Sequence, residues 1–193
     1  MTPAFGGHPV AMALFGGTAA VWIGLEVRQA LRRRADATRT DRGSLVVVRL
    51  CVAAGAVLAA VALRVTATAF PTTAAVVGLS LGVIWAGVGL RWWCFRTLGR
   101  YFTITVMTSA HQPVITTGPY RVLRHPSYAG LLLALGGIGL GYGNWLSLAA
   151  LLALPLGAVI YRIRVEEAAL SATLGAAYTA YADRRKRLLP WVW

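Results

Sequence analysis

The sequence predicts an all-α integral membrane protein with about five transmembrane helices, formed by a single domain over residues 1–193. Hydrophobic residues make up 58% of the chain and its mean hydropathy is +0.64, whereas a soluble domain is usually about 45–50% apolar. The basic residues, which give a net charge of +13, lie in clusters between long apolar runs. Because the positive-inside rule accounts for such clusters, the charge favours a membrane protein over a nucleic-acid-binding protein.

Three transmembrane helices are expected in the first half of the chain, over residues 1–95. Apolar runs cover residues 10 to about 31, 45 to about 66 and 74 to about 94. Each run is long enough to cross a bilayer at about 1.5 Å per residue. A polar linker separates the first two runs, and a short loop around Pro71 separates the last two. Cys51 and Cys94 show neither CxxC nor zinc-ligand spacing, so no metal site is expected.

The second half, over residues 96–193, is expected to contain an irregular segment, a helical hairpin and a C-terminal helix. Residues 98–127 are amphipathic and irregular. Apolar residues 128–142 and 145 to about 163 predict a hairpin around a Gly143-Asn144 turn. A polar helix is expected to begin at Arg162 and to end near Arg187. Gly137 and Gly141 are four residues apart, which indicates close helix packing in lipid.

The distribution of basic residues also predicts the orientation of the chain. Residues 28–42, residues 96–124 and the tail after residue 162 hold nearly all of them, whereas the N-terminus and the loops around Pro71 and Asn144 hold almost none. The positive-inside rule therefore predicts an N-terminus outside and a C-terminus in the cytoplasm. A composition rich in alanine, glycine and arginine, with a single lysine, suggests a bacterial inner (plasma) membrane.

Residues 116–130, TTGPYRVLRHPSYAG, differ from the rest of the chain because they neither continue an apolar helix nor form a polar linker. The steps Gly118-Pro119 and His125-Pro126 disfavour helix at the residue before each proline. Polar, aromatic and basic groups on an irregular backbone at the edge of a membrane suit a polar ligand. A juxtamembrane loop whose arginines contact lipid headgroups has the same composition.

Arg162 and Glu166 form a second group of polar residues, four apart on one helix face. The planar guanidinium of Arg162 suits a carboxylate, and Glu166 can accept a hydrogen bond from a ligand ammonium group. The alternative is a simple ion pair with an arginine membrane anchor. Because a hairpin returns this helix to the membrane side of residues 116–130, we expect the two groups to meet.

These motifs resemble the isoprenylcysteine carboxyl methyltransferase family and its prokaryotic relatives. The likeness rests on GPYRVLRHPSYAG (residues 118–130), on RIRVEEAALSATLGAAYTAY (residues 162–181) and on RLLP in the tail. It extends weakly through LGRYFTITV (residues 98–106) and so covers about the C-terminal half. The resemblance implies an integral membrane carboxyl O-methyltransferase that uses S-adenosylmethionine without a Rossmann domain.

The resemblance also implies roles for individual residues. Arg162 would orient the carboxylate of the methyl acceptor. The positions that match the family's cofactor contacts are Gln112, Pro113, Val114, Ile115, Tyr120, His125, Pro126, Ser127, Tyr128 and Glu166. Two positions depart from the family pattern: Pro113 stands where leucine is common, and Ala176-Ala177 replace an acidic pair.

The expected acceptor is lipophilic, either a prenyl-cysteine or another isoprenoid-type lipid acid that enters from the bilayer. A phospholipid amine is an alternative methyl acceptor, although Arg162 would suit it poorly. Two other functions also stay open. Sterol C14 reductase-like membrane proteins are similar in their C-terminal half and would bind NADPH. A non-catalytic protein would use its arginines to bind anionic membrane lipids.

Overall fold

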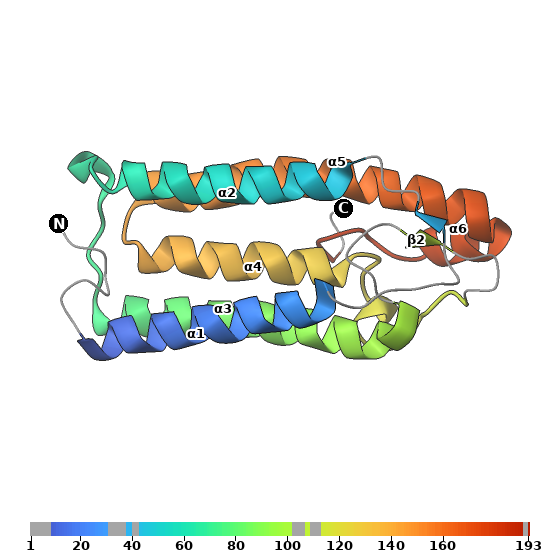
Figure 1. Cartoon of the computed structure of the whole chain (residues 1–193), viewed down its shortest axis with the longest axis horizontal. Coiled ribbons are helices and arrows are strands. Elements are labelled where there is room, and N and C mark those ends of the chain that lie inside the picture. The colour runs from blue at the N-terminus through green and yellow to red at the C-terminus, as the bar shows by residue number, and fades with distance from the viewer. Residues whose placement is uncertain (1–8, 31–37, 40–42, 102–106, 109–112, 191–192) are drawn as a thin grey trace.

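Five long helices lie side by side along one axis of the molecule (Figure 1). The computed structural model describes residues 9–30, 38–39, 43–101, 107–108, 113–190 and 193. The long helices are α1 (Pro9–Ala30), α2 (Ser44–Ala62), α3 (Ala74–Leu98), α4 (Pro126–Gly141) and α5 (Trp145–Leu174). Helices α2, α3 and α5 are each long and apolar enough to cross a membrane, and α4 is a shorter apolar helix. The predicted all-α membrane fold is therefore confirmed, including the hairpin formed by α4 and α5.

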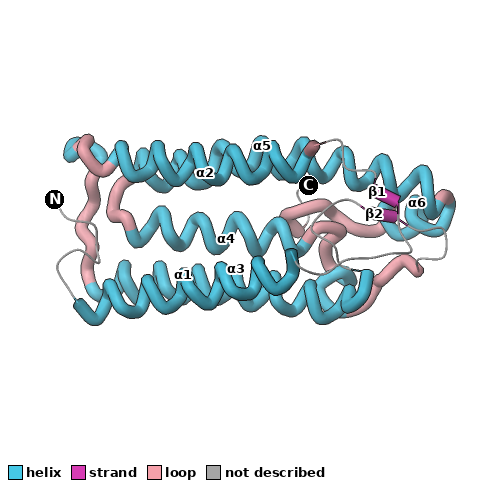
Figure 2. Tube along the Cα trace, in the orientation of Figure 1, coloured by secondary structure: helices cyan, strands magenta, loops and turns pink. Residues whose placement is uncertain are grey.

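Short elements gather at one end of this bundle. They are the 3₁₀ turns η2 (Gly99–Tyr101) and η3 (Gly118–Arg121), helix α6 (Ala176–Ala182), and the strands β1 (Thr38–Arg39) and β2 (Met107–Thr108). The two strands pair antiparallel, which the sequence did not predict. Figure 2 shows these strands and α6 at the end where α1, α3 and α5 finish and where α2 and α4 begin. The turn η1 (Thr66–Thr68) lies at the opposite end of the bundle.

The prediction of a separate helix from Arg162 to Arg187 is wrong. Helix α5 continues without interruption to Leu174, and only the short α6 follows it. Residues 162–174 contain good helix formers and no glycine or proline, so nothing in the sequence ends the helix at the edge of the apolar run. The helix ends at Gly175, whose φ of 54° lies in the left-handed region that favours glycine.

Helices α3 and α4 pack backbone against backbone. A Cβ atom at Gly87 would lie 2.5 Å from the Gly130 carbonyl oxygen, and one at Gly137 would lie 2.8 Å from the Ile84 backbone nitrogen. A Cβ at Gly141 would lie 2.8 Å from a side-chain atom of Phe15. Small residues thus permit close approach, as predicted for Gly137 and Gly141. The contact fixes the first turn of α4, which carries several of the predicted site residues.

Asn144 joins three parts of the chain at the far end of the bundle. Its side-chain Oδ1 accepts hydrogen bonds from the backbone of Leu146 and Ser147, and so caps α5. Its Nδ2 donates to the carbonyl oxygens of Ala62 and Val65, at the end of α2. Asn144 is 1% exposed. One buried amide therefore ties α2 to the hairpin.

Replacing Asn144 with alanine is expected to lower the free energy of unfolding by about 3 kcal/mol, because the cap is lost and the carbonyl groups of Ala62 and Val65 lose a donor. Asn144→Ser is the matched control, since its hydroxyl can keep the cap but the amide that donates to the end of α2 is lost. We expect an intermediate loss for that variant. Thermal unfolding in detergent measures both, and an unchanged midpoint in Asn144→Ala would contradict the role of this residue.

Candidate active site

The predicted irregular segment forms a short, well-supported loop before α4. Pro119 occupies the first turn of η3, and Pro126 is the first residue of α4, both positions where a missing N–H is tolerated. The backbone N–H groups of Arg124 and His125 donate to the carbonyl oxygens of Lys186 and Arg187, at 2.8 and 3.0 Å. The C-terminal tail therefore holds the loop by backbone hydrogen bonds.

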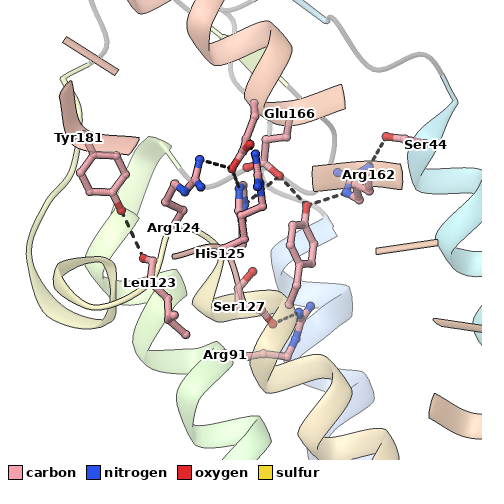
Figure 3. Close-up of polar contacts among 12 residues, drawn as sticks. Ser44, Arg91, Leu123, Arg124, His125, Ser127, Arg162, Glu166 and Tyr181 are labelled. Atoms are coloured by element: carbon pink, nitrogen blue, oxygen red, sulfur yellow. Dashed lines mark hydrogen bonds and ion pairs between the residues drawn. The ribbon is translucent and has the colours of Figure 1, made fainter. Parts of the chain in front are cut away.

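Tyr181 of α6 supports the same loop. Its hydroxyl donates to the carbonyl oxygens of Tyr120 and Leu123, at 2.9 and 3.3 Å, and Figure 3 shows the contact with Leu123. Burial raises the pKa of Tyr181 to about 12, against an opposing effect of Arg185. The hydroxyl is therefore protonated near neutral pH and stays a donor.

The loop and helix α5 meet through a chain of polar side chains. The hydroxyl of Tyr128 donates to Glu166 Oε2 at 2.7 Å and accepts from Arg162 Nε at 2.7 Å. Arg162 Nη1 donates to Ser44 Oγ, at the start of α2, at 2.9 Å. Arg162 is 3% exposed. The two groups that the sequence predicted to meet therefore share a hydrogen-bonded network, which Figure 3 shows.

Glu167 is a residue whose importance the sequence did not reveal. Its Oε1 lies 3.0 Å from His125 Nε2 and 2.9 Å from Arg124 Nη1, and its Oε2 accepts from Arg187 Nε at 2.9 Å. His125 lies farther from Glu166, since Nδ1 and Oε2 are 3.9 Å apart. Neighbouring positions on a helix differ by about 100° in direction. Glu166 therefore faces Tyr128, whereas Glu167 binds the loop and the tail.

An ion pair between α1 and α3, which was not predicted, also reaches this region. Nε and Nη2 of Arg91 each lie 2.6 Å from Glu26 Oε1. Arg91 Nη1 donates to the Ser127 carbonyl oxygen at 2.8 Å, as Figure 3 shows. The pair therefore links α1 to the first turn of α4. Spacing along the chain could not predict it, because Glu26 and Arg91 are 65 positions apart.

A cavity of about 610 Å³ lies among these residues. Arg162 and Glu166 line what we call its polar end, and mostly apolar residues of α1 and α2, together with Glu26 and Arg49, line the rest. The other predicted site residues that line it are Pro113, Val114, Ile115, Tyr120, His125, Ser127 and Tyr128. Pro126 is fully buried in the first turn of α4, and Gln112 lies outside the described residues. The structure thus brings most of the predicted site residues to one cavity.

Tyr178, which also lines the cavity, has a buried hydroxyl without a hydrogen-bond partner among the residues that the structure describes. The side chain is 5% exposed. Burial, together with the nearby carboxylates of Glu167 and Glu166, raises the pKa of Tyr178. A neutral buried hydroxyl normally has a partner. Its position beside Glu166 in the cavity wall fits a polar ligand that accepts or donates a hydrogen bond there.

Comparison with known proteins points to one family. The sequence model of the isoprenylcysteine carboxyl methyltransferase family matches residues 76–172. The chain is 33% identical over 114 residues to protein-S-isoprenylcysteine O-methyltransferase B of Arabidopsis thaliana, and 34% identical over 98 residues to protein-S-isoprenylcysteine O-methyltransferase A of the same plant. These alignments cover 58% and 50% of both partners, so the chain spans about half the length of the curated relatives it matches.

A solved structure shares the fold. The eukaryotic intramembrane Ras methyltransferase, an isoprenylcysteine carboxyl methyltransferase, superposes with a TM-score of 0.69. The superposition covers 96% of this chain and 69% of that one, at 22% sequence identity. At that identity the likeness concerns the arrangement of the helices, including α1 and α2, which precede the residues matched by the family model.

Proposed function

Because the chain belongs to the isoprenylcysteine carboxyl methyltransferase family, we propose that it is an S-adenosylmethionine-dependent carboxyl O-methyltransferase. Its acceptor is the carboxylate of a lipophilic, isoprenoid-type molecule at the cytoplasmic membrane interface. The observation that carries the proposal is the network from Glu166 through Tyr128 to Arg162 at the polar end of a largely apolar cavity. It places an acidic group and a basic group side by side, next to a space for an apolar tail.

The residues at the polar end fit the methyl donor. S-adenosylmethionine carries an amino-acid part and a positive sulfonium group, and when bound it supplies an activated methyl group. Glu166, whose side chain is 30% exposed, presents a carboxylate to positive groups, and the hydroxyl of Tyr178 has no hydrogen-bond partner in the part of the chain that the structure describes. We propose that the donor is held by Glu166 and Tyr178 together with Gln112, Pro113, Val114, Ile115, Tyr120, His125, Pro126, Ser127 and Tyr128.

Arg162 orients the acceptor in this proposal. A carboxylic acid is ionised near neutral pH, so the acceptor oxygen needs no general base. The task of the protein is to align the reacting groups and to exclude water. Tyr128 and Ser44 hold the guanidinium of Arg162 in one orientation, and the burial of Arg162 strengthens its attraction for an anion. His125, held by Glu167, positions the loop and transfers no proton.

The apolar part of the cavity supports a lipophilic acceptor. Helix α1 packs against α3, whereas α2 packs against α5, and residues of both α1 and α2 line the cavity between them. Ile23 lines the cavity and is 62% exposed. The apolar part of the cavity therefore continues to the outer surface of the bundle. An apolar tail can enter there from the bilayer, either as a prenyl-cysteine or as a free isoprenoid-type acid.

We place the site on the cytoplasmic side of a bacterial inner membrane, with the N-terminus outside. The ends of α1, α3 and α5 and the beginnings of α2 and α4 lie at one end of the bundle (Figure 1). The adjoining sequence holds most of the basic residues, which favours the cytoplasmic side. A water-soluble donor and a membrane acceptor would then meet at the interface.

Binding of the donor tests the proposal most directly. Calorimetry on the purified protein in detergent, with S-adenosylhomocysteine and with NADPH, is expected to show binding of the first and not of the second. Replacing Glu166 with alanine is expected to weaken binding about tenfold or more, because a charged hydrogen-bonding group is lost. Asp183→Ala, at an exposed acidic residue after α6, is the matched control and keeps normal affinity.

Other outcomes of this titration exclude the proposal. Binding of NADPH alone would indicate a reductase-like protein, and binding of neither cofactor would indicate a non-catalytic lipid-binding protein. Unchanged affinity in Glu166→Ala would remove that residue from the donor site. Incubation with a labelled methyl donor and total membrane lipid, followed by identification of the labelled product, then assigns the acceptor.

A further inference from the structure

The cavity has a closed end inside the bundle. On α1, α2 and α4 the lining reaches deepest into the bundle at Trp22, Ala56 and Leu131, respectively. Ser44, which contacts Arg162, lies 12 positions before Ala56 on α2. At 1.5 Å per residue, the cavity therefore extends about 18 Å along α2 from the level of Arg162.

Packed side chains lie beyond this level. Ala59, Leu135 and Leu151 form a core cluster in which each residue is no more than 3% exposed. Trp22 packs against this cluster and also against a second core cluster built around Ile84. Close-packed interiors leave no room for additional atoms, so a tail that follows the bundle axis stops at Trp22.

The indole ring of Trp22 is held in place. Its Nε1 donates to Glu26 Oε1 at 3.2 Å, and the same oxygen binds Arg91. Arg91 is 8% exposed and also binds the carbonyl oxygen of Ser127. Because Ser127 precedes Tyr128 in the first turn of α4, the position of the ring is linked to the polar end of the cavity. A fixed ring of this size can limit the length of a ligand.

We infer that Trp22 sets the longest apolar tail that the cavity accepts. The inference rests on the proposed function, since it assumes that the acceptor carboxylate lies at Arg162. The lining residues of α2 at this depth are Ala53 and Ala56, whose small side chains leave space for a chain. Trp22 is thus the largest side chain at the closed end. Tail length, rather than headgroup chemistry, is what this residue selects.

A length series of acceptors tests the inference. The probes are N-acetylcysteine S-linked to geranyl, farnesyl and geranylgeranyl groups, titrated into the 193-residue chain saturated with S-adenosylhomocysteine. Trp22→Ala is expected to improve binding of the longest tail about tenfold relative to the shortest, because each added buried carbon contributes to affinity once space exists. Ala56→Leu is expected to shift the preference toward shorter tails. Trp85→Ala, at an exposed tryptophan of α3 outside the cavity, is the matched control.

The results distinguish a failure of the proposed acceptor from a failure of the length limit set by Trp22. If none of the probes binds the wild-type protein although S-adenosylhomocysteine does, the acceptor part of the proposed function is wrong, and the length limit falls with it. If the probes bind but Trp22→Ala keeps the wild-type length profile, only the length limit is wrong. Equal weakening of all three probes in Trp22→Ala would likewise overturn it, since that result indicates a purely structural role. Opposite shifts in Trp22→Ala and Ala56→Leu support the inference.

Discussion

Replacing Arg162 with lysine is expected to slow methyl transfer about 100-fold, since a misplacement of about 1 Å in an aligned site has an effect of that size. Arginine donates from separate nitrogens to Tyr128 and Ser44. A lysine ammonium group is a single point of charge on a flexible chain. It cannot keep both contacts and also orient a carboxylate, so the positive charge alone does not preserve activity.

The measurement is kcat and KM with a labelled methyl donor, together with donor affinity by calorimetry. Donor binding is expected to persist in Arg162→Lys, because Glu166 and Tyr178 stay in place. Arg164→Lys is the matched control, because Arg164 is an exposed arginine two residues along the same helix. Near-normal methylation by Arg162→Lys would show that a positive charge is sufficient. Loss of activity in both variants would point to a general effect on α5.

The helices were predictable because hydropathy and length are local properties of the sequence. Apolar runs located α1 to α5 to within a few residues at most ends, and the hairpin geometry predicted that residues 116–130 would lie near Arg162 and Glu166. The exception was the end of α5. The apolar run stops near residue 163, but a helix ends where its backbone can no longer continue, and that point is Gly175.

The remaining parts of the site depend on contacts between residues far apart in the sequence, which the spacing of residues within a motif cannot predict. Ser44 and Arg162 are 118 positions apart, and Glu26 and Arg91 are 65 apart. Glu166 and Glu167 look alike in the sequence, and only the rotation of α5 about its axis decides which of them faces the cavity. That rotation is set by packing against α2 and α4.

Replacing Glu167 with alanine is expected to lower the free energy of unfolding by about 3 kcal/mol, the lower end of the loss seen when a buried ion pair is left with one partner, because Glu167 and Arg124 are partly buried. Glu167 lies within hydrogen-bonding distance of Arg124, His125 and Arg187. The side chains of Glu167 and Arg124 are 12% and 13% exposed, so the charge left on Arg124 cannot be solvated fully. The loop and the tail would lose their shared partner.

Thermal unfolding in detergent measures this loss, and the neighbouring Glu166→Ala variant is its control. For a chain of this length, 3 kcal/mol corresponds to a decrease in Tm of about 10 °C. Glu166, which is 30% exposed and bonded to Tyr128, is expected to affect donor affinity strongly and Tm little. Glu167→Ala is expected to lower Tm strongly and to change donor affinity little, when affinity is measured at temperatures where the variant stays folded. If the two adjacent glutamates produced the same balance of effects, their separate roles on the two faces of α5 would be contradicted.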